Sequence, residues 1–352
     1  MKTRVITWQE TMPDCLKEAA DCLRRGGLVA FPTETVYGLG GDGMRPAVSG
    51  KIYAAKGRPS DNPLIIHIAD ESAVEHIAED ISEAAWKLMD TFWPGPLTIV
   101  LKKREKVPSQ TTGGLNTVAV RMPSHPAALE LIRQAGVYVA APSANTSGRP
   151  SPSKAEHVLE DLQGKIDYIV DGGEVDIGIE STIIDMTASV PMILRPGYIT
   201  PEMLEKVIGH VESDPSITEA DRALPPKAPG MKYTHYAPRG ELTIVEGEPA
   251  AVAKRINSLV LEKQGAGQRT GVLATAETKE QYKADVVLSM GRREDLLTVS
   301  AKLYSCLREF DTLGVDYMYA ESFAGDSLGN AIMNRLLKAA GHRVIVVGGE
   351  PV

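Results

Sequence analysis

Residues 56–67 read Lys56-Gly-Arg-Pro-Ser-Asp-Asn-Pro-Leu-Ile-Ile-His67 and join a polar, cationic turn to an apolar run. The apolar run, Leu64 to Ile68, predicts a buried strand that carries His67. Lys56 and Arg58 stand at the mouth of this strand, where lysine supplies a mobile charge and arginine a rigid fork for phosphate or carboxylate oxygens. The stretch therefore predicts an anion site at a strand end. A basic turn that only solvates a loop is the alternative, and the stretch alone leaves both open.

Helices and strands alternate on both sides of this stretch. Residues 1–8 lead into a helix at 14–25, which ends at Gly26-Gly27 before the strand Leu28–Phe31. Ser153 is expected to cap a helix that ends near Leu162. We expect further strands at 97–101, 117–122, 137–141, 168–171, 181–185 and 192–195, with helices at 47–55, 127–134 and 200–208 and two short ones within 71–92.

The last third of the chain has a more regular pattern. Strand-like runs at 242–245, 271–274, 285–288, 316–319 and 344–347 alternate with helical runs at 249–262, 296–310 and 328–340. This alternation predicts right-handed crossovers and a small Rossmann-like parallel sheet. Prolines interrupt the pattern between the two parts. We therefore expect a catalytic domain at 1–210, a linker at 211–239 and an α/β domain at 240–352.

Composition limits the class of protein. A chain of 352 residues exceeds what one core usually serves, so two domains are expected. The net charge of −8 argues against a protein that coats nucleic acid by bulk electrostatics. The three cysteines form no Cys-x-x-Cys pair, which disfavours a disulfide framework or structural zinc. No apolar run reaches the roughly 20 residues of a membrane span, and no signal-peptide core precedes the first helix. We expect a cytoplasmic protein.

Gly38, Gly40 and Gly43 satisfy the G-x-G-x-x-G pattern of dinucleotide-binding folds. The expected context is missing, because Arg45-Pro46 intervenes before any helix and no acidic residue ends a second strand where a ribose would need it. A Walker A loop is also missing, since Ile52 follows Gly50-Lys51. We therefore reject both nucleotide motifs.

Short polar and cationic groups gather at the ends of four segments: 32–40, 56–67, 117–121 and 141–151. Ser181 and Arg195 extend this set. No serine sits in a G-x-S-x-G elbow, and the set contains no nucleophile–base pair. A site with cations and hydroxyls but no nucleophile suits reactions whose substrates are already charged and need only to be held. Phosphoryl or nucleotidyl transfer is the leading example.

Four motifs resemble those of a known family. They are Pro32-Thr-Glu-Thr-Val-Tyr-Gly-Leu39, Lys56-Gly-Arg-Pro59, Asn62-Pro-Leu64 and Pro142-Ser-Ala-Asn-Thr-Ser-Gly148. In this order they closely resemble the YrdC-like domain of threonylcarbamoyl-AMP synthases, over about residues 10–210. The His235-Tyr-Ala-Pro238 segment and the α/β tail resemble the long, two-domain form of that family. The resemblance implies an open, twisted mixed sheet followed by the Rossmann-like domain.

The family joins L-threonine, bicarbonate and ATP into L-threonylcarbamoyladenylate and releases pyrophosphate. Mg2+ is expected with ATP, on its phosphates, because the sequence shows no carboxylate cluster able to cage a metal. Other proteins, the threonylcarbamoyl transferases, then pass the group to an adenosine next to the anticodon of tRNA. The resemblance thus implies small-molecule substrates, weak binding of tRNA, downstream transferase partners and no membrane.

The resemblance also implies the site residues. Lys56 and Arg58 are the expected catalytic residues. The linker tyrosine of the family falls at Tyr236, with Tyr233 as a rival, and is expected to close over the cleft as part of a lid. Expected ATP contacts are Arg58, Asn62, Thr117, Ser143, Asn145, Ser151, Arg195 and Tyr236; expected threonine contacts are Thr35, His67, Arg121, Ala141 and Ser181.

Two rival functions remain at this stage. A concave basic surface that only binds RNA would keep Lys56, Arg58, Arg121 and Arg195 but would need neither Thr35 nor Ser181. A carbamoyl-transfer maturation factor with a YrdC-like domain would carry zinc-binding cysteine clusters, which three scattered cysteines do not provide.

Overall fold

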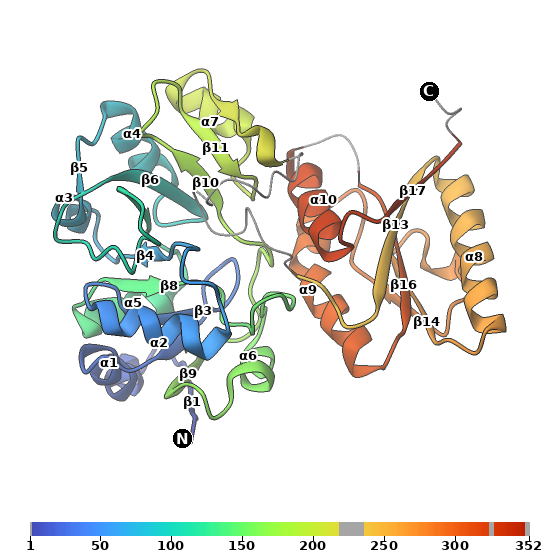
Figure 1. Cartoon of the computed structure of the whole chain (residues 1–352), viewed down its shortest axis with the longest axis horizontal. Coiled ribbons are helices and arrows are strands. Elements are labelled where there is room, and N and C mark those ends of the chain that lie inside the picture. The colour runs from blue at the N-terminus through green and yellow to red at the C-terminus, as the bar shows by residue number, and fades with distance from the viewer. Residues whose placement is uncertain (1, 218–235, 324–326, 349–352) are drawn as a thin grey trace. The chain divides into compact units, whose positions relative to one another are not determined.

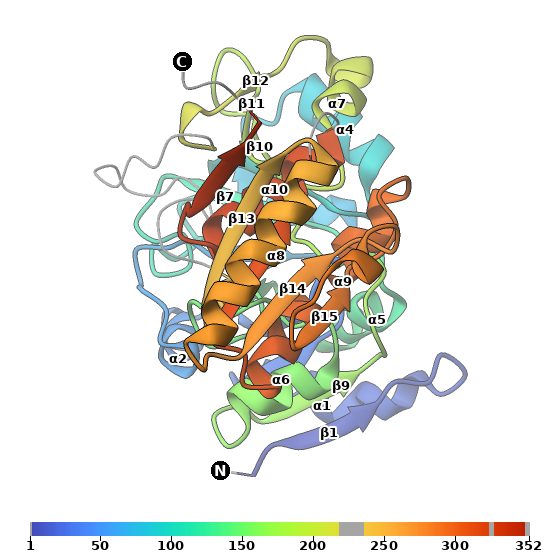
Figure 2. The same cartoon turned by 90° about the vertical axis from the view of Figure 1, so that its right-hand side faces the viewer.

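The computed structural model describes residues 2–217, 236–323 and 327–348. The chain divides into two compact units (Figures 1 and 2). Unit 1 comprises residues 1–147, 151–176 and 180–233, and unit 2 comprises 148–150, 177–179 and 234–352. Two short upstream segments therefore belong to the second unit. The predicted linker, 211–239, falls largely on residues outside the described ranges.

Unit 1 is built on one mixed sheet. Its strands run in the order β1-β9-β2-β3-β8-β4-β7-β6-β10-β11-β12, and β5 pairs with β6. Because β4, β7, β6 and β10 lie side by side, the stretch that starts at Lys56 feeds the middle of the sheet. The strands are β1 Arg4–Thr7, β2 Val29–Phe31, β3 Gly38–Asp42, β4 Ile65–His67, β5 Ala78–Glu79, β6 Leu97–Lys103, β7 Thr117–Arg121, β8 Val139–Ala141, β9 Tyr168–Asp171, β10 Thr182–Asp185, β11 Met192–Arg195 and β12 Glu212–Ser213.

Helices cover this sheet over two hydrophobic clusters. The larger cluster includes Ile52, Leu88, Val158 and Leu204, which come from α2, α4, α6 and α7. The smaller one joins α1 and α5 to Phe31 and its neighbours on β2. The helices are α1 Lys17–Arg24, α2 Pro46–Lys56, α3 Val74–Ile77, α4 Glu83–Phe92, α5 Pro126–Ala135, α6 Ala155–Leu162 and α7 Pro201–Ile208, with 3-10 turns at Pro13–Leu16, Glu71–Ala73 and Pro215–Ile217.

Local sequence explains where α2 begins and ends. Pro46 at the first turn lacks an N–H that would go unpaired there. Gly57 follows the last turn with φ of 64°, a left-handed conformation that favours glycine. The helix thus delivers Lys56 and Arg58 to the start of the loop that precedes β4.

The supposed dinucleotide glycines have a packing role. Gly38 and Gly40 lie in β3, which pairs antiparallel with β2. A Cβ atom on Gly40 would lie 2.6 Å from Val139 Cγ1 and 2.8 Å from Phe31 Cε1, closer than atoms can pack. Close approach of the strands requires glycine here, which supports the rejection of the nucleotide motif.

The sequence analysis missed two strands and assigned one helix cap to the wrong residue. Residues 4–7 form β1, parallel to β9, because the edge of the sheet offers hydrogen bonds that a short polar segment takes up. Lys154, not Ser153, occupies the cap position of α6, and the Ser153 hydroxyl lies 3.4 Å from Nδ1 of His157. The predicted linker starts with β12, which pairs with β11, so its first residues extend the sheet.

Unit 2 confirms the predicted parallel α/β pattern. Its five strands run in the order β15-β14-β16-β13-β17, and every neighbouring pair is parallel. Helix α8 lies on one face of the sheet, and α9 and α10 lie on the other (Figure 1). The elements are β13 Glu241–Gly247, α8 Pro249–Gly265, β14 Thr270–Ala274, a 3-10 turn Lys279–Gln281, β15 Val286–Ser289, α9 Leu296–Thr312, β16 Tyr317–Glu321, α10 Ser327–Ala339 and β17 Val344–Val347.

Candidate active site

Neighbouring strands of unit 1 place several predicted site residues on one face of the sheet. Residues in register share a face, and the registers pair Ile65 with Ala141, and His67 with Arg121. Ile183 is paired in the same way with both Thr98 and Arg195. We call this the ligand face: Ala141 of β8, His67 of β4, Thr117 and Arg121 of β7, Thr98 of β6, Ser181 beside β10, and Arg195 of β11.

Arg121 is held by a buried acidic partner. Its Nη2 donates to Glu34 Oε1 at 2.6 Å, and both side chains are less than a tenth exposed. Nη1 donates to Thr35 Oγ1 at 2.9 Å, and Nε donates to the Gly95 carbonyl at 3.2 Å. One N–H on each terminal nitrogen then has no acceptor among the described residues. Arg121 thus keeps one N–H on each terminal nitrogen for a ligand.

Sequence reasoning missed Glu34. Its second carboxylate oxygen accepts a hydrogen bond from the Ser124 amide at 3.1 Å, so the residue ties the turn at 32–36 to the end of β7. A buried charge is retained only when it is paired, and Glu34 is the counter-charge for Arg121. The available signal was an acidic residue between two threonines in a turn that is otherwise made of hydroxyls.

His67 is buried and neutral. Nδ1 lies 3.1 Å from the Ile65 carbonyl, and the ring meets Phe31 edge to face with centroids 5.9 Å apart. Burial, followed by the positive charge of Arg121, lowers the pKa of His67 to about 3. At neutral pH this imidazole adds no further charge beside Arg121.

Lys56 organises the loop that follows β8. Its ammonium group donates to the carbonyls of Ser143 and Asn145 and, at 3.3 Å, to Asn145 Oδ1. Ser143 Oγ also donates to Asn145 Oδ1, at 2.6 Å. The Ala144 amide donates to the Tyr37 carbonyl at 2.8 Å, so this loop lies along the segment that follows Thr35. Three separate motifs of the sequence therefore meet here.

Arg58 and Asn62 lie in the turn between α2 and β4. Arg58 donates to the carbonyls of Asn62 at 3.4 Å and Pro63 at 3.1 Å. The Asn62 side chain is 1% exposed, and its Oδ1 has no hydrogen-bond donor among the described residues. A buried acceptor without a donor costs roughly 1–3 kcal/mol. Asn62 Oδ1 is therefore a natural point for a ligand N–H or O–H.

A second buried cluster joins Ser181 and Arg195. Arg195 Nε donates to the Ser181 carbonyl at 3.0 Å and Nη2 to Ser181 Oγ at 3.1 Å. Ser181 Oγ lies 2.7 Å from Thr98 Oγ1. Beside this cluster, Ser151 Oγ donates to Glu180 Oε1 at 2.6 Å. Glu180 is a further buried acid that was not among the predicted site residues.

The remaining predicted contacts are Thr117 and the linker tyrosines. Thr117 is half-buried at the start of β7. Tyr236 belongs to unit 2, where its ring lies 5.1 Å from that of Tyr304, and Tyr233 lies outside the described residues. The choice between the two tyrosines stays a prediction.

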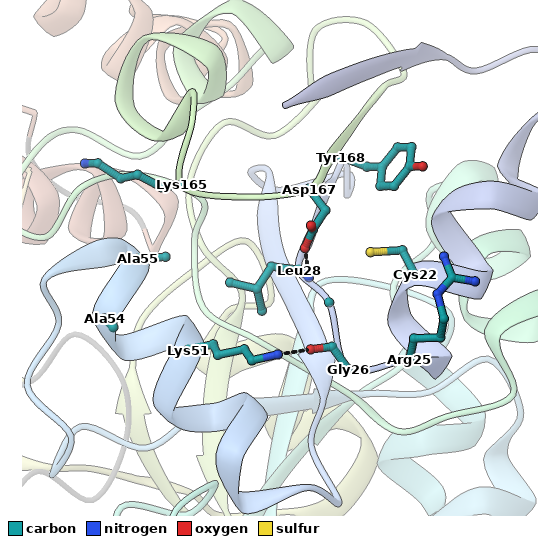
Figure 3. A pocket seen from close by; sticks show the side chains of 11 residues that line it. Cys22, Arg25, Gly26, Leu28, Lys51, Ala54, Ala55, Lys165, Asp167 and Tyr168 are labelled. Carbon is teal, nitrogen blue, oxygen red and sulfur yellow. Dashed lines mark hydrogen bonds between the residues drawn. The ribbon is translucent and has the colours of Figure 1, made fainter. Parts of the chain in front are cut away.

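A hollow of about 620 Å3 in unit 1 contains none of the predicted site residues (Figure 3). Lys51 donates to the Gly26 carbonyl at 2.7 Å, and Asp167 accepts from the Leu28 amide at 2.8 Å. Burial raises the pKa of Cys22 in its wall to about 11, so this thiol is protonated and unreactive at neutral pH.

Metal and membrane features are lacking in the parts of the chain that the structure describes. Within residues 2–217, 236–323 and 327–348, no three His, Cys, Asp or Glu side chains gather closely enough to hold a metal ion. Among those same residues, no helix is both long and apolar enough to cross a bilayer.

The fold and the ligand face define an α/β protein with a buried site of arginines, hydroxyls and one neutral histidine. Residues 21–197 match the Sua5/YciO/YrdC family profile, described as telomere recombination. Residues 199–341 match the profile described as threonylcarbamoyl-AMP synthase, C-terminal domain.

Full-length relatives agree with these profiles. The chain is 53% identical to the threonylcarbamoyl-AMP synthase of Bacillus subtilis over 94% of both chains. It is 47% identical to that of Pyrococcus abyssi, over 99% of this chain and 98% of the relative. The structure of P. abyssi Sua5 complexed with L-threonine matches with a TM-score of 0.93 at 46% identity, over 99% of this chain and 100% of that chain. The chain belongs to the threonylcarbamoyl-AMP synthase family of enzymes.

Proposed function

We propose that this enzyme makes L-threonylcarbamoyladenylate from L-threonine, bicarbonate and ATP and releases pyrophosphate. The observation that supports this most is the ligand face, where residues of separate motifs converge on one surface of the sheet. The relatives named above carry the same activity in their names, and one was solved with L-threonine.

L-Threonine would bind at the Arg121 end of the ligand face. The two remaining N–H groups of Arg121 match the two oxygens of its carboxylate. Ser181, Thr35 and neutral His67 would contact its hydroxyl and amine, with Ala141 as a wall. The unprotonated amine is the form that would attack carbon dioxide, with release of a proton, or bicarbonate, with release of water, and neutral His67 adds no charge beside it.

The resulting threonine carbamate is anionic and would attack the α-phosphate of ATP. The new bond joins a carbamate oxygen to the α-phosphorus, and the bond to the β-phosphate oxygen breaks to release pyrophosphate. Arg58 and Arg195 would offset charge that develops on the phosphates, and Mg2+ would arrive with ATP as part of the substrate. The remaining expected ATP contacts are Asn62, Thr117, Ser143, Asn145, Ser151 and Tyr236.

Lys56 would act mainly by shaping the ATP loop. Its ammonium group has three N–H donors, and the Ser143 and Asn145 oxygens account for three hydrogen bonds. In this proposal Lys56 fixes Ser143 and Asn145 for the nucleotide, while Arg58 makes the direct phosphate contact.

The use of the product in the cell is proposed from the activity of the family. The adenylate would supply a cytoplasmic threonylcarbamoyl transferase that modifies tRNA next to the anticodon, and tRNA itself would bind this enzyme only weakly. The predicted lid, residues 211–239, lies largely outside the described residues, and its closure over the site stays a prediction.

Mass spectrometry of the product tests the reaction. With 13C-bicarbonate, the adenylate should carry the label in its carbamoyl carbon. Arg58→Ala should lose the product while it keeps its fold, whereas Arg133→Ala, an exposed arginine on α5, should keep activity. A product without 13C, or an Arg58→Ala deficit that only tracks the fraction of unfolded protein, would contradict the proposal.

A further inference from the structure

Helix α9 of unit 2 has a stripe of residues that contacts three separate segments of the chain. Ser300, Tyr304, Arg308 and Asp311 are spaced three or four residues apart, and Ala301 lies three residues before Tyr304, so all five lie on one face of the helix. Ser300, Tyr304 and Arg308 are at most 2% exposed. We call these five residues the α9 stripe.

The first segment is 148–150. Arg308 donates to the Pro150 carbonyl twice, from Nη2 at 2.6 Å and from Nε at 3.2 Å. Asp311 lies 3.5 Å from the Arg149 guanidinium. A carbonyl held by two N–H groups of a buried guanidinium has little rotational freedom. The Pro150 carbonyl and the Ser151 amide share one peptide plane, so Arg308 holds the plane from which Ser151 begins.

The second segment is 177–179. Gly178 has φ of 77°, and a Cβ atom at this position would lie 2.3 Å from the Ser300 carbonyl oxygen and 2.4 Å from Ala301 Cα. The backbone of Gly178 therefore lies directly on the stripe, where only glycine fits. Glu180 and Ser181 follow Gly178 by two and three residues along the chain.

The third segment is 236–239. The Tyr236 ring packs on Tyr304 at an interplanar angle of 32°. The Ala237 amide donates to the Gly148 carbonyl at 2.9 Å, and the Arg239 amide donates to Asp311 Oδ1 at 2.7 Å. This segment thus binds both the stripe and the first segment.

Each segment includes, or lies within two residues of, a residue expected to contact substrate: Ser151 for ATP, Ser181 for L-threonine, and Tyr236 for ATP. We infer that the α9 stripe positions these three contacts, with Arg308 as the positioning residue for Ser151. The inference rests on the proposed function, and it gives unit 2 a task in the reaction. The hydrogen bond between Ser151 and Glu180 links the first two contacts to each other.

A purely structural Arg308 makes a different prediction. If the guanidinium only satisfied a buried carbonyl, its loss would lower stability and the amount of active enzyme, with an unchanged KM in the molecules that remain folded. A positioning role changes KM for ATP in folded enzyme, because a misplaced Ser151 weakens nucleotide binding.

Arg308→Met and Arg308→Lys, made in the full chain, distinguish the two. Methionine keeps much of the stem and removes every donor, whereas lysine restores one charged donor toward Pro150. We expect Arg308→Met to raise KM for ATP about tenfold, with a smaller effect on KM for L-threonine, and Arg308→Lys to recover most of the loss. A wild-type KM for ATP in folded Arg308→Met would overturn the inference.

A pair of glycine variants tests the stripe without touching Arg308. Gly178→Ala forces a Cβ into α9, whereas Gly173→Ala has a similar φ of 86° but meets no atom within 4 Å. We expect KM for L-threonine to rise at least about fivefold in Gly178→Ala and to stay near the wild-type value in Gly173→Ala. Equal values in both variants would overturn the inference. Wild-type enzyme without threonine-dependent pyrophosphate release would instead refute the proposed function, so the two failures are distinguishable.

Discussion

Buried His67 should make unit 1 less stable as the pH falls below neutrality. Burial lowers its pKa in the folded protein from 6.5 to about 3. The unfolded chain therefore binds a proton at pH values where the folded protein does not. The stability from neutral His67 is fully present above the unfolded pKa, and it is lost progressively as the pH falls from 6.5 toward 3.

The magnitude follows from the distance in pH below the unfolded pKa. At pH 5 the solution is 1.5 units below the unfolded value of 6.5 and still well above the folded value. At about 1.36 kcal/mol per unit, His67 should cost unit 1 about 2 kcal/mol between pH 7 and pH 5.

The tryptophans allow this loss to be measured in unit 1 alone. All three of them, Trp8, Trp86 and Trp93, lie in that unit, so their fluorescence during urea unfolding does not report on unit 2. We expect the wild-type midpoint to fall by roughly 1 M urea from pH 7 to pH 5 through His67. His67→Gln should lose this part of the pH dependence, whatever its stability at pH 7.

Comparing wild type with His67→Gln cancels the contributions of the other titrating groups to the pH dependence of stability. Burial also lowers the pKa of His125, but that residue is present in both proteins and its effect cancels. If the free energy of unfolding of wild type and His67→Gln changed equally between pH 7 and pH 5, the neutral, buried state of His67 would be wrong.

Two further predictions concern packing and charge. Glu34→Gln should lower the free energy of unfolding of unit 1 by about 3–5 kcal/mol, because it leaves the Arg121 charge buried and unpaired. Glu83→Gln, on the exposed face of α4, should change that free energy by too little to measure. Equal effects of the two variants in urea unfolding would contradict the buried pair. Gly40→Ala should destabilise unit 1 by about 1–3 kcal/mol, because its Cβ collides with Val139 and Phe31. Gly50→Ala in α2, where nothing lies within 4 Å of the new Cβ, should instead stabilise it by up to about 1 kcal/mol, and a loss at Gly50 would refute this packing.

The sequence predicted most elements because their signals are local. The alternation in the last third of the chain gave the parallel sheet, and Pro46 and Gly57 mark the ends of α2. The strand at residues 4–7 was missed because only its distant partner β9 makes it a strand. Residues 212–213 were missed for the same reason, because only their pairing with β11 makes them a strand.

The site residues, too, were predicted where their signal is local and missed where it depends on a distant partner. Polar motifs at strand ends contain most residues of the ligand face but not Thr98, because neighbouring strands of a sheet bring such ends together; their contacts with substrate stay predictions. Glu34 was missed because its partner Arg121 is 87 residues away, and the sequence does not show that pairing. Lys56 looked like a free cation, and only the structure shows that its donors hold the loop at 143–145. The α9 stripe was likewise hidden, because it joins segments more than 100 residues apart.

Pyrophosphate release with one substrate omitted at a time tests the proposed reaction most directly. The wild-type enzyme should release pyrophosphate only when ATP, L-threonine and bicarbonate are present together. Release at an undiminished rate without L-threonine would contradict the assignment of Arg121, His67 and Ser181 to a threonine site, and with it the proposed function.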